Sequence, residues 1–394
     1  MAVDLAERAK LGSSLWTDTR FRGLLLQALT IGLAGTFLAF IVSNTAHNLE
    51  ERGIASGFGF LWVQAGYQLE NTLITFEPTD THFRAFIAGL LNTLLVSGVG
   101  IVLATVVGFI LGVLRLTPNW LLSKAVYCYI EVVRNIPLLL QIYFWYAVMI
   151  SLPQVRNAID LGIGAYISNR GLQAPAPILE SGFSIVPIAL LLAVVAAMAI
   201  SRWAHRRQEA TGQIFPAFWV NLALIVLLPV VAYFAAGRPM SFDIPALGNF
   251  GFRGGFTITP EFVALLLALS LYTAAFIAEI VRAGILAISH GQTEAAFALG
   301  IKPRWTMRLI IIPQALRVIV PPLTSQYLNL TKNSSLGVAI GYAELVATLS
   351  GITLNQTGQA VECIAITMAV YLTISLLISS FMNWYNRHIA LVER

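Results

Sequence analysis

The sequence has little charge. Only 11% of its 394 residues are charged, while 57% are hydrophobic; a soluble domain carries roughly 25% charged residues. So few charges cannot cover the water-facing surface of a chain of this length, and an ordinary soluble protein is therefore excluded. The net charge of +5 is also small. We interpret it as charge flanking membrane spans and expect no nucleic-acid partner.

Cysteine is scarce, and the motifs of several enzyme classes are missing. The two cysteines, Cys128 and Cys363, lie in apolar stretches, so no disulfide framework is implied. The five histidines are scattered without an H-E-x-x-H pattern, and neither serine nor cysteine lies in a recognisable nucleophile motif. The phosphate-binding pattern G-x4-G-K-[ST] is absent too. These absences argue against a metal site, a membrane-embedded enzyme and an ATP site on this chain.

What the sequence has in abundance is long apolar runs. Continuous runs of about 20 apolar residues favour membrane-spanning helices over barrel strands, whose apolar residues alternate. We therefore predict an all-α integral membrane protein with about eight transmembrane helices. The predicted spans are 24–42, 85–114, 124–150, 183–201, 213–236, 260–286, 309–330 and 361–386.

The flanks of these runs predict the orientation. The first run is longer than a signal-peptide core and follows a polar stretch, so we predict an uncleaved span; a cleavable signal ending near residues 43–46 is the alternative. Cations gather on one side of the alternating spans, as at Arg202, Arg206 and Arg207 between the fourth and fifth. The positive-inside rule places that side, and with it both termini, in the cytosol.

A polar stretch between the sixth and seventh spans predicts a short helix. Ser289 or Thr293 can cap its start, and Gly300 followed by Pro303 ends it. About two turns of helix are too short to be stable alone in water, so other structure must hold the segment.

The side chains of this short helix suit docking into a groove of a cytosolic protein. Its alanines permit close approach, and its larger apolar residues supply anchors; a re-entry turn without a partner is the alternative. The residues predicted to couple to a partner are Glu294, Ala295, Ala296, Phe297, Leu299 and Gly300.

This stretch also carries a family resemblance. It reads E-A-A-x3-G-x9-I-x-I-P from Glu294 to Pro313. That pattern resembles the EAA loop of bacterial ABC importer membrane subunits, usually written E-A-A-x3-G-x9-I-x-L-P, with Ile312 as the one departure. Residues 129–146, 272–300 and 310–336 resemble the polar amino acid (histidine, glutamate and glutamine type) permease branch. The remaining segments look like those of the large permeases of general L-amino-acid import systems.

The resemblance implies a five-helix type I importer core. Its first part is 85–150, and its second part is 260–394, which includes the EAA coupling loop 288–313. Residues 1–84 then form a cytosolic N-terminus, an extra span and a periplasmic segment. Residues 151–259 form inserted periplasmic loops around an extra helical hairpin, 183–236.

The implied function is that of a pore-forming permease subunit of an ATP-driven importer in the bacterial inner membrane. It would move L-amino acids, with glutamate, glutamine and aspartate among the candidates, from periplasm to cytosol. Its partners would be a second, related permease subunit in a heterodimer, a dimer of ATP-binding-cassette ATPases, and a periplasmic amino-acid-binding protein. ATP and Mg²⁺ would bind the ATPase, so no cofactor is expected on this chain.

Two rival classes remain open at this stage. An ion-coupled secondary amino acid transporter would need no ATPase, but would more often show matched broken helices in two halves, and no such symmetry is visible. A structural scaffold is the second class. Its spans would not need Glu, Arg and Lys at membrane depth, whereas this sequence has such residues there.

Charges within apolar runs are candidates for the solute path, because a charge at a span centre costs about 2.5–3.5 kcal/mol. Glu279 and Arg282 can pair at i, i+3, and we favour that structural pairing over solute contact. Pro137 predicts a break in its helix, whose freed backbone groups Arg134, Asn135 or Gln141 can satisfy.

Two polar segments complete the prediction. In the second span a stripe of glycines with Asn92 and Thr93 favours helix packing over solute contact. After the seventh span a dense polar run predicts an outer gate or solute contact, with plain capping as an equal alternative; Lys332 would suit a substrate carboxylate. The complete set of solute-path candidates is Asn92, Thr93, Arg134, Asn135, Gln141, Tyr272, Glu279, Arg282, Gln326, Asn329, Lys332, Asn333, Ser334 and Ser335.

Overall fold

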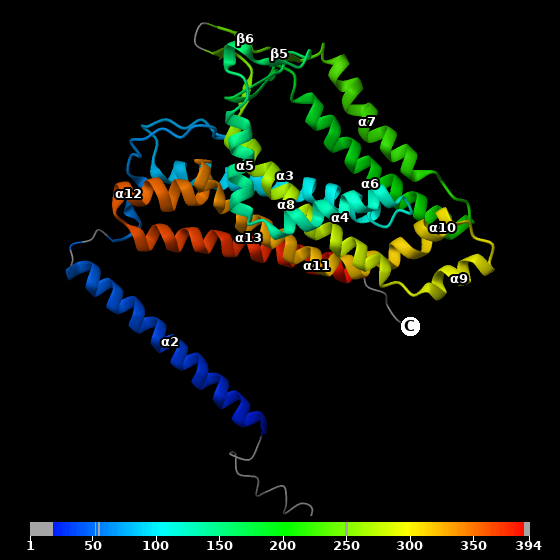
Figure 1. Cartoon of the computed structure of the whole chain (residues 1–394), viewed down its shortest axis with the longest axis horizontal. Coiled ribbons are helices and arrows are strands. Elements are labelled where there is room, and N and C mark those ends of the chain that lie inside the picture. Colours follow the sequence, from blue (N-terminus) through cyan, green and yellow to red (C-terminus); the bar gives the residue numbers. More distant parts are fainter. Residues whose placement is uncertain (1–18, 52, 54–55, 249–250, 390–394) are drawn as a thin grey trace, which may run out of the picture. The chain divides into compact units, whose positions relative to one another are not determined.

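The computed structural model describes residues 19–389 except 52, 54–55 and 249–250. The predicted cytosolic termini at 1–18 and 390–394 lie outside the described residues. Figure 1 shows the helices and strands of the described residues. By their internal contacts they form two compact units. Unit 1 comprises Met1–Leu91 and Glu344–Leu377, and unit 2 comprises Asn92–Ala343 and Ile378–Arg394. Helices α3 and α13 contribute residues to both.

Within the described residues, seven helical stretches are long and apolar enough to cross a membrane, or eight if the bent pair α4–α5 counts as one span. The prediction of a helical membrane protein with about eight spans is confirmed. The seven stretches are α2 (Thr19–Glu51), α3 (His82–Leu114), α6 (Ile185–Thr211), α7 (Ala217–Ala235), α8 (Pro260–Leu286), the stretch Pro303–Ile340, and α13 (Ala360–Ile389).

The predicted span 124–150 is two helices instead of one. Helix α4 (Trp120–Asn135) and helix α5 (Leu138–Ile150) meet at an angle of 107°. The break falls at Ile136 and Pro137, where proline was expected to end the first helix, but the bend is far sharper than a proline kink. With 13 residues, α5 is only about 20 Å long, shorter than a bilayer core.

Unit 1 is held by contacts between segments far apart in sequence. The 3-10 turn η1 (Phe58–Trp62) buries Phe60 against Leu345, Leu349 and Cys363. Leu345 and Leu349 lie beside and in the π-helical segment η5 (Val346–Thr353), which α12 (Leu354–Thr357) extends, and Cys363 lies in α13. Two hydrogen bonds add to this packing. The Tyr67 hydroxyl lies 2.9 Å from Thr353 Oγ1, and Gly57 N–H donates to Glu362 Oε1 at 2.5 Å.

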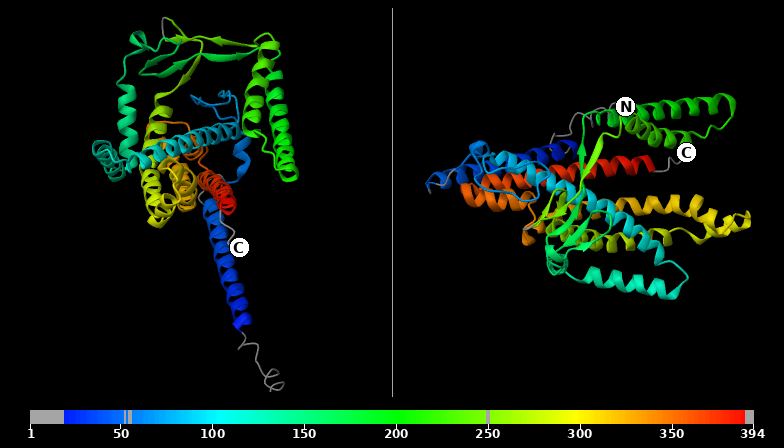
Figure 2. Two further views of the ribbon diagram at one scale, coloured as in Figure 1. Left: turned by 90° about the vertical axis from the view of Figure 1, so that its right-hand side faces the viewer. Right: turned by 90° about the horizontal axis from the view of Figure 1, so that it is seen from above.

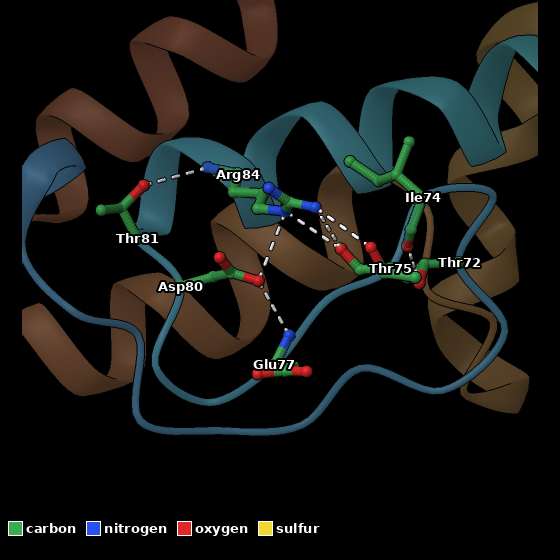
Figure 3. Close-up of polar contacts among 7 residues, drawn as sticks. All are labelled: Thr72, Ile74, Thr75, Glu77, Asp80, Thr81 and Arg84. Atoms are coloured by element: carbon green, nitrogen blue, oxygen red, sulfur yellow. Dashed lines mark hydrogen bonds and ion pairs between the residues drawn. The ribbon is translucent and has the colours of Figure 1, made fainter.

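The loop that leads into α3 is organised around Arg84 (Figure 3). Its guanidinium donates to the Thr75 carbonyl at 2.8 and 3.0 Å and lies 3.3 Å from Asp80. The Asp80 carboxylate also accepts the Glu77 N–H at 2.9 Å. The loop before α3 and the first turn of that helix are therefore joined by a polar network of their own.

Unit 2 is built around α8. Its small residues let neighbouring helices approach closely, and its Leu265, Leu269, Ile277 and Val281 are almost fully buried. Helices α4, α5 and α11 all pack against it. The stretch after the short helix α9 consists of α10 (Pro303–Thr306), the π-helical segment η3 (Met307–Ile311), α11 (Ile312–Asn333) and the 3-10 segment η4 (Ser334–Ile340).

Residues 151–259, which we predict to be an insertion, contain a helical hairpin, α6 and α7, flanked by short strands that the sequence did not predict (Figure 2). A four-stranded antiparallel sheet has the order β1-β2-β3-β8, with Leu172 opposite Ile258. Strands from before and after the hairpin thus pair with each other. The strands are β1 (Ile159–Asp160), β2 (Tyr166–Ser168), β3 (Gly171–Ala174), β4 (Ala176–Leu179), β5 (Met240–Asp243), β6 (Ala246–Leu247), β7 (Phe252–Arg253) and β8 (Phe256–Ile258); β4 pairs with β5 and β6 with β7.

Candidate coupling site and solute path

The predicted short helix is α9 (His290–Ala298), at the end of α8 opposite the strands (Figure 1). Ser289 is its N-cap, and its hydroxyl accepts the Gly291 N–H at 3.3 Å. The helix ends at Gly300, whose φ of +70° is left-handed. There the N–H groups of Gly300 and Ile301 donate to the carbonyls of Phe297 and Ala296. Glycine suits this position because a Cβ would be strained at positive φ.

The outward face of α9 is apolar and uncovered. Phe297 is 56% exposed and Leu299 is 78% exposed. Glu294 and Ala295 are exposed as well, and Glu294 forms no ion pair within the described part of the chain. These residues leave an exposed apolar surface next to an exposed carboxylate at the end of α9.

One predicted coupling residue faces the other way. Ala296 is only 1% exposed, so its side chain packs against its own chain and is not available to a partner. It lies on the inner face of α9, where a small residue lets the helix sit close to the body. Gln314 Nε2, on α11, donates to Gln292 Oε1 at 3.2 Å and braces the same helix.

At the break between α4 and α5, backbone carbonyl groups accept hydrogen bonds from side chains that were expected to bond there. Gln141 Nε2 donates to the carbonyls of Val133 and Ile136 at 2.8 and 2.9 Å, and Asn135 Nδ2 donates to the Glu131 carbonyl at 2.7 Å. These amides stabilise the bend, because a backbone carbonyl without a partner is costly away from water. Gln141 and Asn135 therefore have a structural role in this state.

Glu279 and Arg282 form the predicted pair, with an Arg282 Nη2 to Glu279 Oε1 distance of 2.6 Å. Sequence reasoning missed the second partner: Arg115, just after α3, also donates to Glu279. Arg134 lies with its guanidinium carbon 5.1 Å from the centre of the Phe276 ring. Tyr272, one turn earlier on α8, contacts the same ring at 5.0 Å between centroids.

The remaining candidates lie on separate elements. Asn92 is buried in α3, where its Nδ2 donates to the Ala343 carbonyl at 2.9 Å, and Thr93 is buried beside it. At the end of α11, the hydroxyls of Ser334 and Ser335 each donate to a backbone carbonyl three residues earlier. Capping therefore accounts for these two serines.

Four polar residues around the end of α11 differ in exposure. Asn329 and Lys332 are exposed, whereas Gln326 and Asn333 are half-buried. Lys332 forms no ion pair within the described residues. The hydrogen bonds and ion pairs bring Glu279 together with Arg282 but leave the α11 group separate from it.

A buried acid was missed altogether. Glu344, between η4 and η5, is fully buried, and its carboxylate accepts the N–H groups of Val346 and Ala347 at 2.8 and 2.7 Å. The Tyr371 hydroxyl donates to it at 3.2 Å. Burial raises the pKa of Glu344 to about 7, although these three hydrogen bonds favour the ionised form. A lone acid in the apolar run "GYAELVATL" was the signal that could have revealed it.

Comparison with known proteins identifies the family. The model of the "binding-protein-dependent transport system inner membrane component" family matches residues 185–391, more than half of the chain.

Three curated relatives match almost the whole chain. It is 52% identical over 378 residues to the general L-amino acid transport system permease protein AapQ of Rhizobium johnstonii, covering 96% of this chain and 94% of that protein. It is 50% identical to the putative amino-acid ABC transporter permease protein YhdX of Escherichia coli, with coverage of 97% and 98%. It is 48% identical to the glutamate/glutamine/aspartate/asparagine transport system permease protein BztB of Rhodobacter capsulatus, with coverage of 97% of each. The chain therefore belongs to the family of inner membrane components of binding-protein-dependent transport systems, as the E-A-A motif indicated.

Proposed function

We propose that this chain is a pore-forming permease subunit of an ATP-driven importer of L-amino acids. The names of three relatives that match nearly its full length support the amino acid class, and one of those names specifies glutamate, glutamine, aspartate and asparagine. We infer that acidic and amide amino acids are among the solutes. Lys332, exposed and without an ion pair among the described residues, stays our candidate contact for a solute carboxylate.

We assign ATP hydrolysis to a separate subunit that would bind α9. The observation that carries this assignment is the exposed pair Phe297 and Leu299 on a helix too short to be stable unaided. When nucleotide binding moves the ATPases, the docked helix would move with them. Because α9 directly follows α8, the most buried helix of unit 2, that movement would reach the spans and bias them between two states.

The proposed assembly follows from this role. Two permease chains, of which the second is a related protein, would enclose the pore. A dimer of ATPases would hold ATP and Mg²⁺, and a soluble binding protein would deliver the solute. Lys302, Arg304 and Arg308 flank α9 and favour a cytosolic position for it, which would put the strands at the other end of α8 in the periplasm.

The test is solute-stimulated ATP hydrolysis by the reconstituted importer, comparing two variants of the α9 region with matched controls. Glu294→Lys reverses an exposed charge that we expect to accept a charge-assisted hydrogen bond from the ATPase. Gly300→Asp places a side chain at a φ of +70°. We expect both variants to assemble and the stimulated rate to fall at least about tenfold in each. Glu294→Lys would lose a hydrogen bond to a charged group, which contributes about 1.5–3 kcal/mol. Gly300→Asp would strain the backbone that ends α9, because a side chain is disfavoured at positive φ.

The controls make the same chemical changes on the hairpin. Glu209→Lys reverses an exposed charge on α6, and Gly212→Asp alters a glycine with the same φ of +70° at the end of that helix. Both should retain wild-type stimulation. If Glu294→Lys and Gly300→Asp also retained it, α9 would not be the coupling element.

A further inference from the structure

A pocket that the transport function does not explain lies where α3 ends and α4 begins, against α8. Its volume is about 500 Å³, and both α3 and α8 are apolar spans that terminate beside it. The pocket therefore lies at the depth where the hydrocarbon gives way to lipid headgroups. Arg115, Lys124 and Arg282 contribute to its lining.

The charges around this pocket do not balance. Both Arg115 and Arg282 bond to a single carboxylate, that of Glu279. Lys124 has no ion pair within the described part of the chain. Of the three cations, only the two arginines are paired, and they share one carboxylate. The two arginine side chains are only 15% and 29% exposed, so water screens this excess positive charge incompletely.

An aromatic ring holds two of these cations together. The guanidinium carbon of Arg115 and the Nζ of Lys124 each lie 4.9 Å from the centre of the Tyr127 ring. The backbone between them is tied by Ser123, whose hydroxyl donates to the Arg115 carbonyl at 2.8 Å. Contacts within the chain therefore hold Arg115 and Lys124 in place beside the pocket.

The rim of the pocket is suited to lipid. Trp120, which lines it, is 75% exposed, and the adjacent Leu121 is 70% exposed. Aromatic residues favour the headgroup level of a bilayer, and exposed leucine favours acyl chains. Basic pockets beside membrane helices bind the headgroups of anionic lipids.

We propose that this pocket binds the phosphate of an anionic phospholipid headgroup, with the acyl chains lying along Trp120 and Leu121. A free phosphate ion shares the same chemistry at the cations, but it would gain nothing from the apolar rim. The proposal therefore commits to the lipid as the source of the phosphate.

The test measures lipid retained by the purified full-length chain in detergent, using native mass spectrometry. The probes are dioleoyl phosphatidylglycerol, dioleoyl phosphatidylcholine and inorganic phosphate. The wild type should retain phosphatidylglycerol in preference to phosphatidylcholine. Lys124→Gln should weaken phosphatidylglycerol binding about fivefold, the factor for one lysine near an anionic membrane surface, while Lys124→Arg should restore it.

Arg206→Gln is the matched control. It removes the same charge from α6, on the membrane side predicted to be the same, but Arg206 does not line this pocket. It should leave lipid retention unchanged. Equal retention of the two lipids by the wild type, or an equal loss in Lys124→Gln and Arg206→Gln, would overturn the proposal. Displacement of the lipid by inorganic phosphate at equal concentration would overturn it too, because the acyl chains would then contribute nothing.

Discussion

At the scale of single residues, the buried acid Glu344 links several elements of unit 1, a role that its sequence context did not indicate. Its carboxylate satisfies two N–H groups at the start of η5 and also accepts from α13 through Tyr371. One side chain therefore joins the loop after η4 to two helical elements. A carboxyl in so buried a position favours its neutral form, which makes this junction sensitive to pH.

The sign of that sensitivity can be predicted. The folded pKa of Glu344, about 7, lies above the ordinary value of 4.5. As pH rises from about 4.5 to 7, the unfolded chain loses the proton while the folded chain keeps it. Stability should therefore fall across this window and level off above it. Glu344→Gln removes the titration, so its melting temperature should drop less between pH 5 and pH 8 than that of the wild type, by a few degrees.

The measurement is thermal melting of the detergent-solubilised chain, followed by intrinsic fluorescence. Glu70→Gln, which alters an exposed acid of the same unit, is the control and should melt with the wild-type pH profile. An unchanged pH profile in Glu344→Gln would show that Glu344 is not the group that titrates.

At the scale of elements, the seam between α3 and α8 depends on two glycines. A Cβ on Gly108 would lie 2.6 Å from Ile277 Cβ, and a Cβ on Gly112 would lie 2.7 Å from the Ala278 carbonyl oxygen. Real Cβ atoms do not lie so close to other atoms, so only glycine at these two positions lets α3 pack this closely against α8. The pattern G-x3-G that these two glycines form is typical of closely packed membrane helices.

Gly112→Ala should therefore force α3 and α8 apart, at a cost of about 1–3 kcal/mol for overpacking, partly offset by the better helix propensity of alanine. The matched control is Gly98→Ala in the same helix, where a Cβ would meet nothing within 4 Å. We expect a lower melting temperature for Gly112→Ala and an equal or higher one for Gly98→Ala. Equal melting temperatures for the two variants would contradict a tight seam.

Elements differ in how far local sequence predicted them. The end of α9 at Gly300 and the break before Pro137 were predictable, because glycine at positive φ and proline both act through their own backbone. The strands around the hairpin were not. They are two to four residues long, and β3 pairs with β8, more than eighty residues away. Short strands with distant partners leave no periodic pattern in the chain.

At the scale of the whole molecule, the proposed function requires partner subunits, and the exposed face of α9 is where we propose that the ATPase binds. We predict that vesicles containing the purified chain alone will not accumulate L-amino acids under an imposed proton or sodium gradient. Vesicles with the second permease, the ATPases, the binding protein and ATP should do so. Radiolabelled glutamate and glutamine are the probes. Gradient-driven uptake by the chain alone would instead indicate a secondary transporter.

The candidate solute path shows where sequence reasoning reaches its limit. The pairing of Glu279 with Arg282 and the amides at the α4–α5 break could be predicted, because those partners are close in sequence. Partners remote in sequence could not, and the choice between a gate and capping after Lys332 stayed open. Glu279 proved to be shared by Arg115, from a segment 164 positions earlier, and the serines after Lys332 cap their own backbone. Whether a buried polar group is satisfied depends on neighbours that only folding brings close.

The sequence by itself determined the class of this protein: sparse charge with long apolar runs requires helices in a bilayer, and the E-A-A motif indicates the family and the short helix α9. These features depend on composition and on local backbone chemistry, so they can be read along the chain. Tertiary structure alone decided which face of α9 is open, which arginines share Glu279, and where cations outnumber carboxylates. Those properties arise from distances between segments remote in sequence, and electrostatic energy depends on such distances.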